Sequence, residues 1–203
     1  MKQLFLASSF EDVAHRLPEF AGQAITGKVV TFIPTANVSQ ENHGYVLAAK
    51  KAFEALGMIV DELEVSAASA VDIKRKLESN DAIYVSGGNT FFLRQELAIT
   101  GADRLIIDQV NQGKLYIGES AGSVITSPDI AYISAMDSIK KAPLLTSTQG
   151  LNLVDFYTLP HYNSAPFEAD TETIITDYGT KVNLKPITNA QIITVLGDKV
   201  AII

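Results

Sequence analysis

The chain has 203 residues, of which 47% are hydrophobic and 19% are charged, and it contains no cysteine. This composition is typical of a globular protein with a sizeable core, and the length predicts a single domain over residues 1–203. The formal net charge of −7, without any block of Lys or Arg, argues against a nucleic-acid or anionic-membrane partner, and the missing cysteines exclude disulfides, thiolate zinc sites and a cysteine nucleophile.

The amino-terminal residues do not have the pattern of a targeting segment. The first nine residues carry one positive charge and only four consecutive apolar residues, too few for the core of a signal peptide. Later apolar runs stay well below the roughly 18 residues that a membrane-spanning helix needs. These features predict a cytoplasmic protein.

Short strand-like runs alternate with helical patterns over the first 120 residues. Strands are predicted at residues 3–7, 28–34, 58–63, 81–86 and 114–118. Helices are predicted at residues 41–56, 91–98 and 102–111, the first of them ended by Gly57. This rhythm predicts an α/β fold in which a mostly parallel sheet carries helices on both faces.

The last third of the chain has a different pattern. Strand-like runs occupy residues 153–160, 185–188, 190–196 and 199–203, and Gly197-Asp198 is a turn-prone pair between the last two. These two runs predict a C-terminal β-hairpin. Residues 127–151 are the least regular part of the chain, and long irregular segments in compact domains are often functional.

The first chemical motif is Gly-x-Ser-x-Gly at residues 118–122, between a predicted strand and a short helical run. In a nucleophile elbow the glycines allow a sharp turn, and the serine hydroxyl projects from the start of the helix. An isolated match also fits a glycine-rich turn with a capping serine. The order of strand, turn and helix favours Ser120 as a nucleophile, with the following amide, that of Ala121, available to an oxyanion.

A second motif, Gly87-Gly88-Asn89-Thr90, follows the predicted strand 81–86. Its backbone amides are candidates for a second oxyanion donor, at Gly88, and its side chains for a wall of the substrate site. The plain alternative is a strand-to-helix connection in which Thr90 caps the helix. We predict Asn89, together with Glu119 of the first motif, as residues that contact substrate.

A serine nucleophile needs a base, and the chain offers three histidines. His15 lies among charged residues and is predicted to be solvated. His43, near the start of a predicted helix, fits a capping or packing role and remains a minor candidate. His161 follows the strand-like run 153–160, and the carboxyl ends of strands would bring it to one crevice with Gly88 and Ser120. His161 is the predicted base, with a buried structural histidine as the alternative.

The third member of a triad is normally a carboxylate that orients the histidine and stabilises its charged form. Asp137, in the irregular segment between nucleophile and histidine, is the favoured candidate. Asp129, Asp155 and Glu168 compete with it. Each of these acids also fits an ordinary solvated surface position.

Three segments together resemble a known family. They are VSGGNT at 85–90, GESAGS at 118–123 and LPHY at 159–162. In order and spacing they resemble the Gly-Gly-Asn segment, the Gly-x-Ser-Ala-Gly elbow and the Pro-His segment of dipeptidase E, cyanophycinase and their relatives, peptidase family S51. The resemblance spans nearly the whole chain. It implies a sheet similar to that of the class I glutaminase amidotransferases, with flavodoxin-like layering and serine in place of their cysteine.

The same resemblance implies roles for individual residues. Ser120 would be the nucleophile, His161 the general base and acid, and the amides of Gly88 and Ala121 the oxyanion donors, while Asp137 matches the family's aspartate only loosely. It also implies amide hydrolysis without a metal or other cofactor, a small peptide as substrate and, since the family often forms small homo-oligomers, a homodimer.

The leading hypothesis is a serine peptidase that hydrolyses a peptide bond near a chain end through an acyl-enzyme. One alternative is an esterase of the α/β-hydrolase type, which shares the elbow. The modest length, the Gly-Gly-Asn loop and the C-terminal hairpin argue against it. The other alternative is a binding protein that keeps the crevice without turnover, which the fold alone does not exclude.

Substrate choice is predicted to differ from that of dipeptidase E. That enzyme is specific for an N-terminal aspartate, which an arginine shortly after the catalytic histidine recognises. Here residues 165–172 contain three acids and no base, and the next cation is Lys181. An aspartyl side chain would meet like charge there, so neutral or basic residues should be accepted better. Arg94 is the cation to consider if aspartate is preferred.

Overall fold

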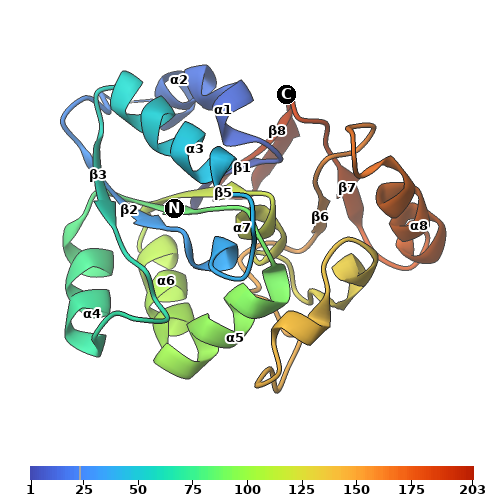
Figure 1. Cartoon of the computed structure of the whole chain (residues 1–203). Coiled ribbons are helices and arrows are strands. Elements are labelled where there is room, and N and C mark those ends of the chain that lie inside the picture. Colours follow the sequence, from blue (N-terminus) through green and yellow to red (C-terminus); the bar gives the residue numbers. More distant parts are fainter. Residues whose placement is uncertain (23) are drawn as a thin grey trace.

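A central sheet of seven strands organises the chain (Figure 1), as seen in a computed structural model that describes residues 1–22 and 24–203. The strand order is β3-β2-β4-β5-β1-β8-β9. The strands are β1 (Gln3–Ala7), β2 (Val29–Ile33), β3 (Ile59–Glu62), β4 (Ala82–Val85), β5 (Leu115–Glu119), β8 (Ile192–Leu196) and β9 (Lys199–Ile202). The first five are parallel, whereas β8 and β9 add antiparallel strands at one edge. The predicted α/β fold and C-terminal hairpin are confirmed.

Successive side chains of the strands enter two separate cores. Leu4 and Leu6 of β1 pack on one side of the sheet, and Phe5 and Ala7 pack on the other. This alternation is the period of a strand buried on both faces. One face carries α1 (Phe10–Val13), α2 (Leu17–Ala21) and α3 (Gly44–Ala55). The opposite face carries α4 (Ala70–Ser79), α5 (Thr90–Thr100), α6 (Ala102–Asn111) and α7 (Ala121–Val124).

Helix boundaries agree with the predictions in part. The helix predicted at 41–56 begins at Gly44, and Gly57 follows it with a φ of +77°. The helix α5 begins at Thr90, but the capping side chain is Asn89, whose amide oxygen accepts the N–H of Phe92. The helices α4 and α8 (Glu168–Tyr178) were not predicted, and each of them buries only two side chains.

Beside the main sheet lies a smaller unit that carries the predicted base. The strands β6 (Tyr157–Leu159) and β7 (Leu184–Pro186) pair in parallel, and α8 connects them. Both strands are shorter than the runs predicted at 153–160 and 185–188. The irregular segment 127–151 contains two short 3-10 helices, η3 (Ala131–Ala135) and η4 (Ile139–Lys141). Two others, η1 (Ala14–Arg16) and η2 (Thr35–Asn37), lie earlier in the chain.

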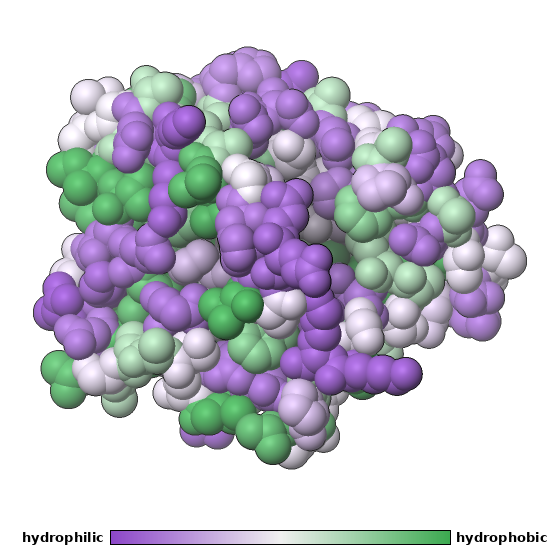
Figure 2. All heavy atoms as spheres, in the orientation of Figure 1, coloured by the Kyte–Doolittle hydropathy of each residue, from purple (hydrophilic) through white to green (hydrophobic). Residues whose placement is uncertain are grey.

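The surface mixes polar and apolar side chains. On the face that Figure 2 shows, hydrophobic side chains form small groups, and hydrophilic side chains lie between these groups. Within residues 1–22 and 24–203, none of the helices is long and apolar enough to span a bilayer.

Candidate active site

Ser120 occupies a sharp turn between β5 and α7. Its φ of +47° and ψ of −108° are unusual for a residue with a side chain, and such strain is common at functional sites. The backbone N–H of Ser120 donates to the carbonyl of Ala7 at 2.9 Å, which anchors the turn on β1. The turn also requires Gly122, because a Cβ there would lie 2.0 Å from the carbonyl oxygen of Val85. The predicted strand-turn-helix arrangement at 118–122 is therefore present.

His161 follows β6 and lies against Ser120. Its Nε2 is 3.0 Å from the Ser120 Oγ, although the two residues are 41 positions apart. The backbone of His161 has a φ of +60°, and its N–H donates to the Oγ of Ser8 just after β1. Burial lowers the pKa of His161 below the usual 6.5, so the imidazole is neutral at neutral pH. A neutral Nε2 can accept the hydroxyl proton of Ser120.

The other ring nitrogen of His161 contacts an amide side chain. Its Nδ1 lies 2.8 Å from the Oδ1 of Asn189, which belongs to the connection between β7 and β8. An amide oxygen can only accept a hydrogen bond, so Nδ1 carries the proton and Nε2 presents its lone pair to Ser120. Asn189 was missed because only acids were considered for this position. A polar residue in the turn before β8 was the available signal.

Asp137 does not contact His161, which corrects its predicted place in the triad. Its Oδ2 accepts the backbone N–H of Thr90 at 2.8 Å, because the 3-10 helix η3 ends beside the start of α5. Burial raises the pKa of the Asp137 carboxyl. Asp129 is also committed elsewhere, as it accepts from Ala131 and Thr148.

Gly88 lines the pocket with Ser120, and Ala121 follows Ser120 as the first residue of α7, whereas Asn89 does not line the pocket. Gly88 lines the pocket with a φ of +138°, and a Cβ there would lie 2.1 Å from the carbonyl oxygen of Ala36. Asn89 is 2% exposed and its side chain caps α5 and donates to the carbonyl of Ser138. Its predicted contact with substrate is therefore corrected to a structural role.

Glu119 borders the pocket, but its carboxylate is already bonded within the protein. It is 3% exposed, Oε1 accepts the N–H of Phe10 at 2.8 Å, and Oε2 accepts the hydroxyl of Tyr84. Burial raises its pKa to about 7 despite these hydrogen bonds. A role in positioning the turn fits these contacts better than the predicted contact with substrate.

A pocket of about 440 Å³ opens over Ser120 and His161 at the carboxyl ends of the strands. Its walls come from the loops after β1, β4 and β5 and from the segments around η2, η3 and the start of α8, and comprise Ser8, Ser9, Gln40, Asn42, Tyr45, Gly87, Gly88, Glu119, Ser120, Met136, Asp137, His161, Ala165, Pro166, Phe167 and Asn189. Among the described residues that form these walls, two carry carboxyl groups and none is Lys or Arg. The other two histidines lie elsewhere: His15 is exposed, and His43 bonds to Asn37.

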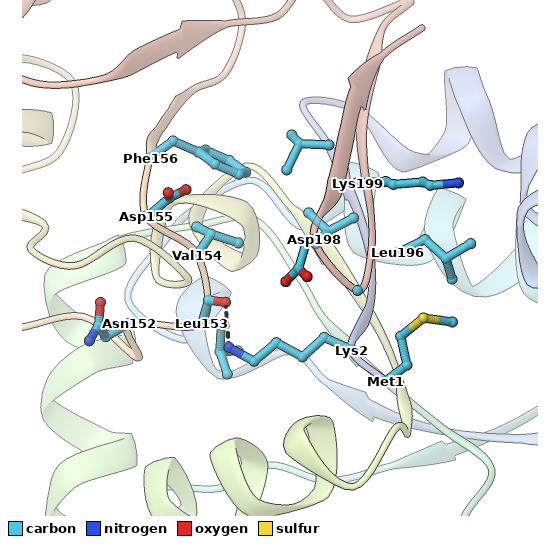
Figure 3. A pocket seen from close by; sticks show the side chains of 13 residues that line it. Met1, Lys2, Asn152, Leu153, Val154, Asp155, Phe156, Leu196, Asp198 and Lys199 are labelled. Carbon is cyan, nitrogen blue, oxygen red and sulfur yellow. Dashed lines mark hydrogen bonds between the residues drawn. The ribbon is translucent and has the colours of Figure 1, made fainter.

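A larger hollow of about 900 Å³ lies at the opposite end of β1 (Figure 3). Met1, Lys2, the loop 152–156 and the β8–β9 turn line it, and the Lys2 Nζ donates to the carbonyl of Leu153 at 2.9 Å. Asp155, another predicted competitor for the triad, belongs to this hollow. No serine or histidine lines it in the described part of the chain, so the smaller pocket is the one equipped for nucleophilic chemistry.

Comparison with known proteins places the chain in a family. Residues 4–203 match peptidase family S51. An uncharacterised peptidase of Listeria monocytogenes is 56% identical over 98% of this chain and 97% of its own length, and peptidase E of a Nostoc species is 34% identical over 81% and 67%.

Two solved structures are also similar. A candidate peptidase E protein from Listeria monocytogenes is 54% identical, with a TM-score of 0.95 over 100% of this chain and 98% of the other. A peptidase from an acI-B1 Actinobacterium, 19% identical, shares the fold with a TM-score of 0.72 over 100% and 87%. With a family match over almost its whole length and a serine and histidine paired in its pocket, this chain belongs to peptidase family S51, the serine peptidases that it resembled by sequence.

Proposed function

We propose that this chain hydrolyses the peptide bond nearest a chain terminus, with Ser120 as nucleophile, His161 as general base and acid, and Asn189 as the residue that orients the imidazole. The contact of 3.0 Å between Ser120 Oγ and His161 Nε2, at a strained turn on the pocket wall, carries this proposal. A hydroxyl at this distance from a neutral imidazole is the arrangement that nucleophilic serine chemistry needs.

In the acylation step, Ser120 Oγ attacks the scissile carbonyl carbon while His161 Nε2 takes the hydroxyl proton. The carbonyl oxygen becomes an oxyanion, for which the amides of Gly88 and Ala121 are the proposed donors. Ala121 is the first residue of α7, so its N–H has no partner within that helix. His161 then gives its proton to the leaving nitrogen, and the C–N bond breaks to leave an ester on Ser120.

Deacylation repeats these roles with water. His161 removes a proton from the water as the oxygen attacks the ester carbonyl, and the proton then returns to Ser120 Oγ as the acid is released. Asn189 keeps Nδ1 protonated in both steps, because its amide oxygen accepts from that nitrogen. No metal ion takes part in either proposed step.

The size and charge of the pocket support a small substrate. Its volume of about 440 Å³ lies within the range of small-molecule sites, and loop residues 40–42 and 165–167 bound it. Asp137, together with the ionised form of Glu119, makes its walls acidic, and none of the described residues that line it is cationic. An ammonium group at a peptide's amino terminus would be attracted to such walls, which favours cleavage near that end.

Labelling with a fluorophosphonate, followed by mass mapping of the adduct, tests this function. We expect one adduct at Ser120 and hydrolysis of short peptides. Ser120→Ala should abolish both, since loss of a triad nucleophile costs on the order of 10⁶ in turnover. Ser79→Ala, at an exposed position in α4, is the matched control and should change neither. Full peptide hydrolysis by Ser120→Ala would overturn the proposal, and turnover of esters without any peptide hydrolysis would favour an esterase.

A further inference from the structure

The imidazole of His161 has a third contact besides its two hydrogen bonds. The ring of Phe167 stacks on it, with ring centroids 4.7 Å apart and planes inclined by 26°. Two turn hydrogen bonds bring Phe167 back over the histidine. Ser164 N–H donates to the His161 carbonyl at 3.0 Å, and Phe167 N–H donates to the Ser164 carbonyl at 2.9 Å. Phe167 is also the N-cap residue immediately before α8.

The proposed reaction places a positive charge on this imidazole, yet its hydrogen-bond partners are neutral. Asn189 supplies an oxygen without the charge that an aspartate would bring. Tyr45, Glu119 and Asp137 line the same pocket as His161, and Glu168 and Asp170 follow Phe167 in α8. Two of these acids have committed carboxylates: Glu119 is bonded to Phe10 and Tyr84, and Asp137 is bonded to Thr90. Burial further disfavours the charged ring.

We propose that Phe167 is a positioning residue that stabilises the protonated form of His161 through the face of its aromatic ring, and so takes over part of the role that a carboxylate has in other triads. The negative face of an aromatic ring attracts a cation within about 6 Å of its centroid, and the attraction strengthens when water is excluded. The stacking also restricts tilting of the imidazole ring out of its plane. This inference rests on the proposed function, because it assigns His161 a cationic intermediate state.

Fluorination of Phe167 separates the electrostatic effect from packing. Replacing this residue with 4-fluoro-, trifluoro- and pentafluorophenylalanine in the full chain weakens the negative ring face while changing volume little. The pKa of His161, followed by NMR titration with His15 and His43 as internal references, should fall stepwise. Proton affinity should drop by roughly three- to tenfold across the series, with kcat lowered in parallel and KM unchanged.

Two further variants keep the test decisive if a fluorinated protein does not fold. Phe167→Leu retains apolar volume without an aromatic face and should lower the pKa of His161, whereas Phe167→Tyr should restore it. Fluorination of Phe20, which packs against Phe5 on the other side of the sheet, is the matched control and should have no effect. A pKa of His161 that does not respond to fluorination would overturn the inference even if Ser120 is labelled. Failure to label Ser120, with an intact stepwise titration, would instead overturn only the proposed catalysis.

Discussion

At the scale of single residues, the histidine proposed as general base forms its orienting hydrogen bond with an uncharged partner. Asn189 gives His161 the same hydrogen-bond direction that a carboxylate would, with Nδ1 as donor, but no opposite charge. The imidazole is also buried, which further favours its neutral form. The pKa of His161 is therefore lower than that of an ordinary histidine, and the ring keeps its neutral, basic form to lower pH.

Substitutions of Asn189 should separate orientation from charge. Asn189→Ala removes the hydrogen bond, and we expect kcat to fall by about ten- to a hundredfold as the ring loses its orientation. Asn189→Asp keeps an acceptor and adds a negative charge, which should raise the pKa of His161 and move the acid limb of the pH profile of kcat/KM to higher pH. Profiles of both variants and the wild type provide the measurement. Unchanged kcat in Asn189→Ala would contradict the orienting role.

Glu119 should make the stability of the protein depend on pH. Its pKa is about 7 in the folded protein against 4.5 ordinarily. Between these values the folded protein holds a proton that the unfolded chain has lost, so the free energy of unfolding falls as pH rises, by at most about 1.4 kcal/mol per pH unit. The stabilisation is complete below pH 4.5 and is lost as the pH passes 7.

Urea unfolding at several pH values between 5 and 8 measures this dependence. Glu119→Gln cannot ionise, so its stability should fall less steeply with pH than that of the wild type. Glu54→Gln, at an exposed position of α3, is the control and should keep the steeper slope. Equal slopes for wild type and Glu119→Gln would show that this carboxyl does not titrate in that range.

At the scale of elements, the turn from β5 into α7 depends on close backbone contact with β4. Gly122 leaves no space for a side chain, since its Cβ would lie 2.0 Å from the Val85 carbonyl oxygen. Backbone atoms of a central strand cannot move aside without disturbing the sheet. Helix α7 would have to shift, and Ser120 with it.

Two glycine substitutions test whether steric contact at the turn matters. Gly122→Ala should lower the free energy of unfolding by about 3 kcal/mol or more, because the added methyl group overlaps backbone. Gly101→Ala is the comparison: its φ is +73° but no atom lies within 4 Å of the added group, so a cost of about 1 kcal/mol is expected. Urea unfolding of both variants gives the values. Similar losses of unfolding free energy in the two variants would mean that backbone conformation, rather than steric contact, sets the cost of replacing glycine at the turn.

At the scale of the whole molecule, the pocket is acidic because of how the elements meet. Glu119 comes from the end of β5 and Asp137 from the segment after η3, and the start of α8 adds further acids nearby. Arg94, the cation considered for recognition of aspartate, does not line the pocket, since its side chain binds Asp103 and the carbonyl of Gln149.

The substrate preference should follow this charge. A panel of dipeptides with N-terminal Asp, Ala or Lys should give a kcat/KM for Asp at least about fivefold below the others, because one close like-charge pair costs about 1 kcal/mol or more. Asp137→Asn should reduce this difference in kcat/KM, and it should raise KM for every dipeptide with a free amino terminus. A strong preference for Asp in the wild type would show that a cation outside the described pocket walls recognises the substrate.

Local patterns in the sequence were sufficient to predict the sheet and the turn that presents Ser120. Buried parallel strands are nearly continuous apolar runs, and the close approach at Gly122 requires glycine, so both features are visible in short segments. The helix α8 left little signal, because it buries only Thr171 and Ile174.

The environment of each site residue was decided by the tertiary structure. Asn189 meets His161 only because β7 leads the chain back past β6 before it enters the main sheet, and no local pattern marks an amide for that position. Asp137 has the chemistry of a triad acid, but the end of η3 directs it to the N–H of Thr90 instead. Side-chain type and chain order therefore predicted which residues gather at the carboxyl ends of the strands, whereas hydrogen-bond partners depend on distances of a few ångströms that only packing determines.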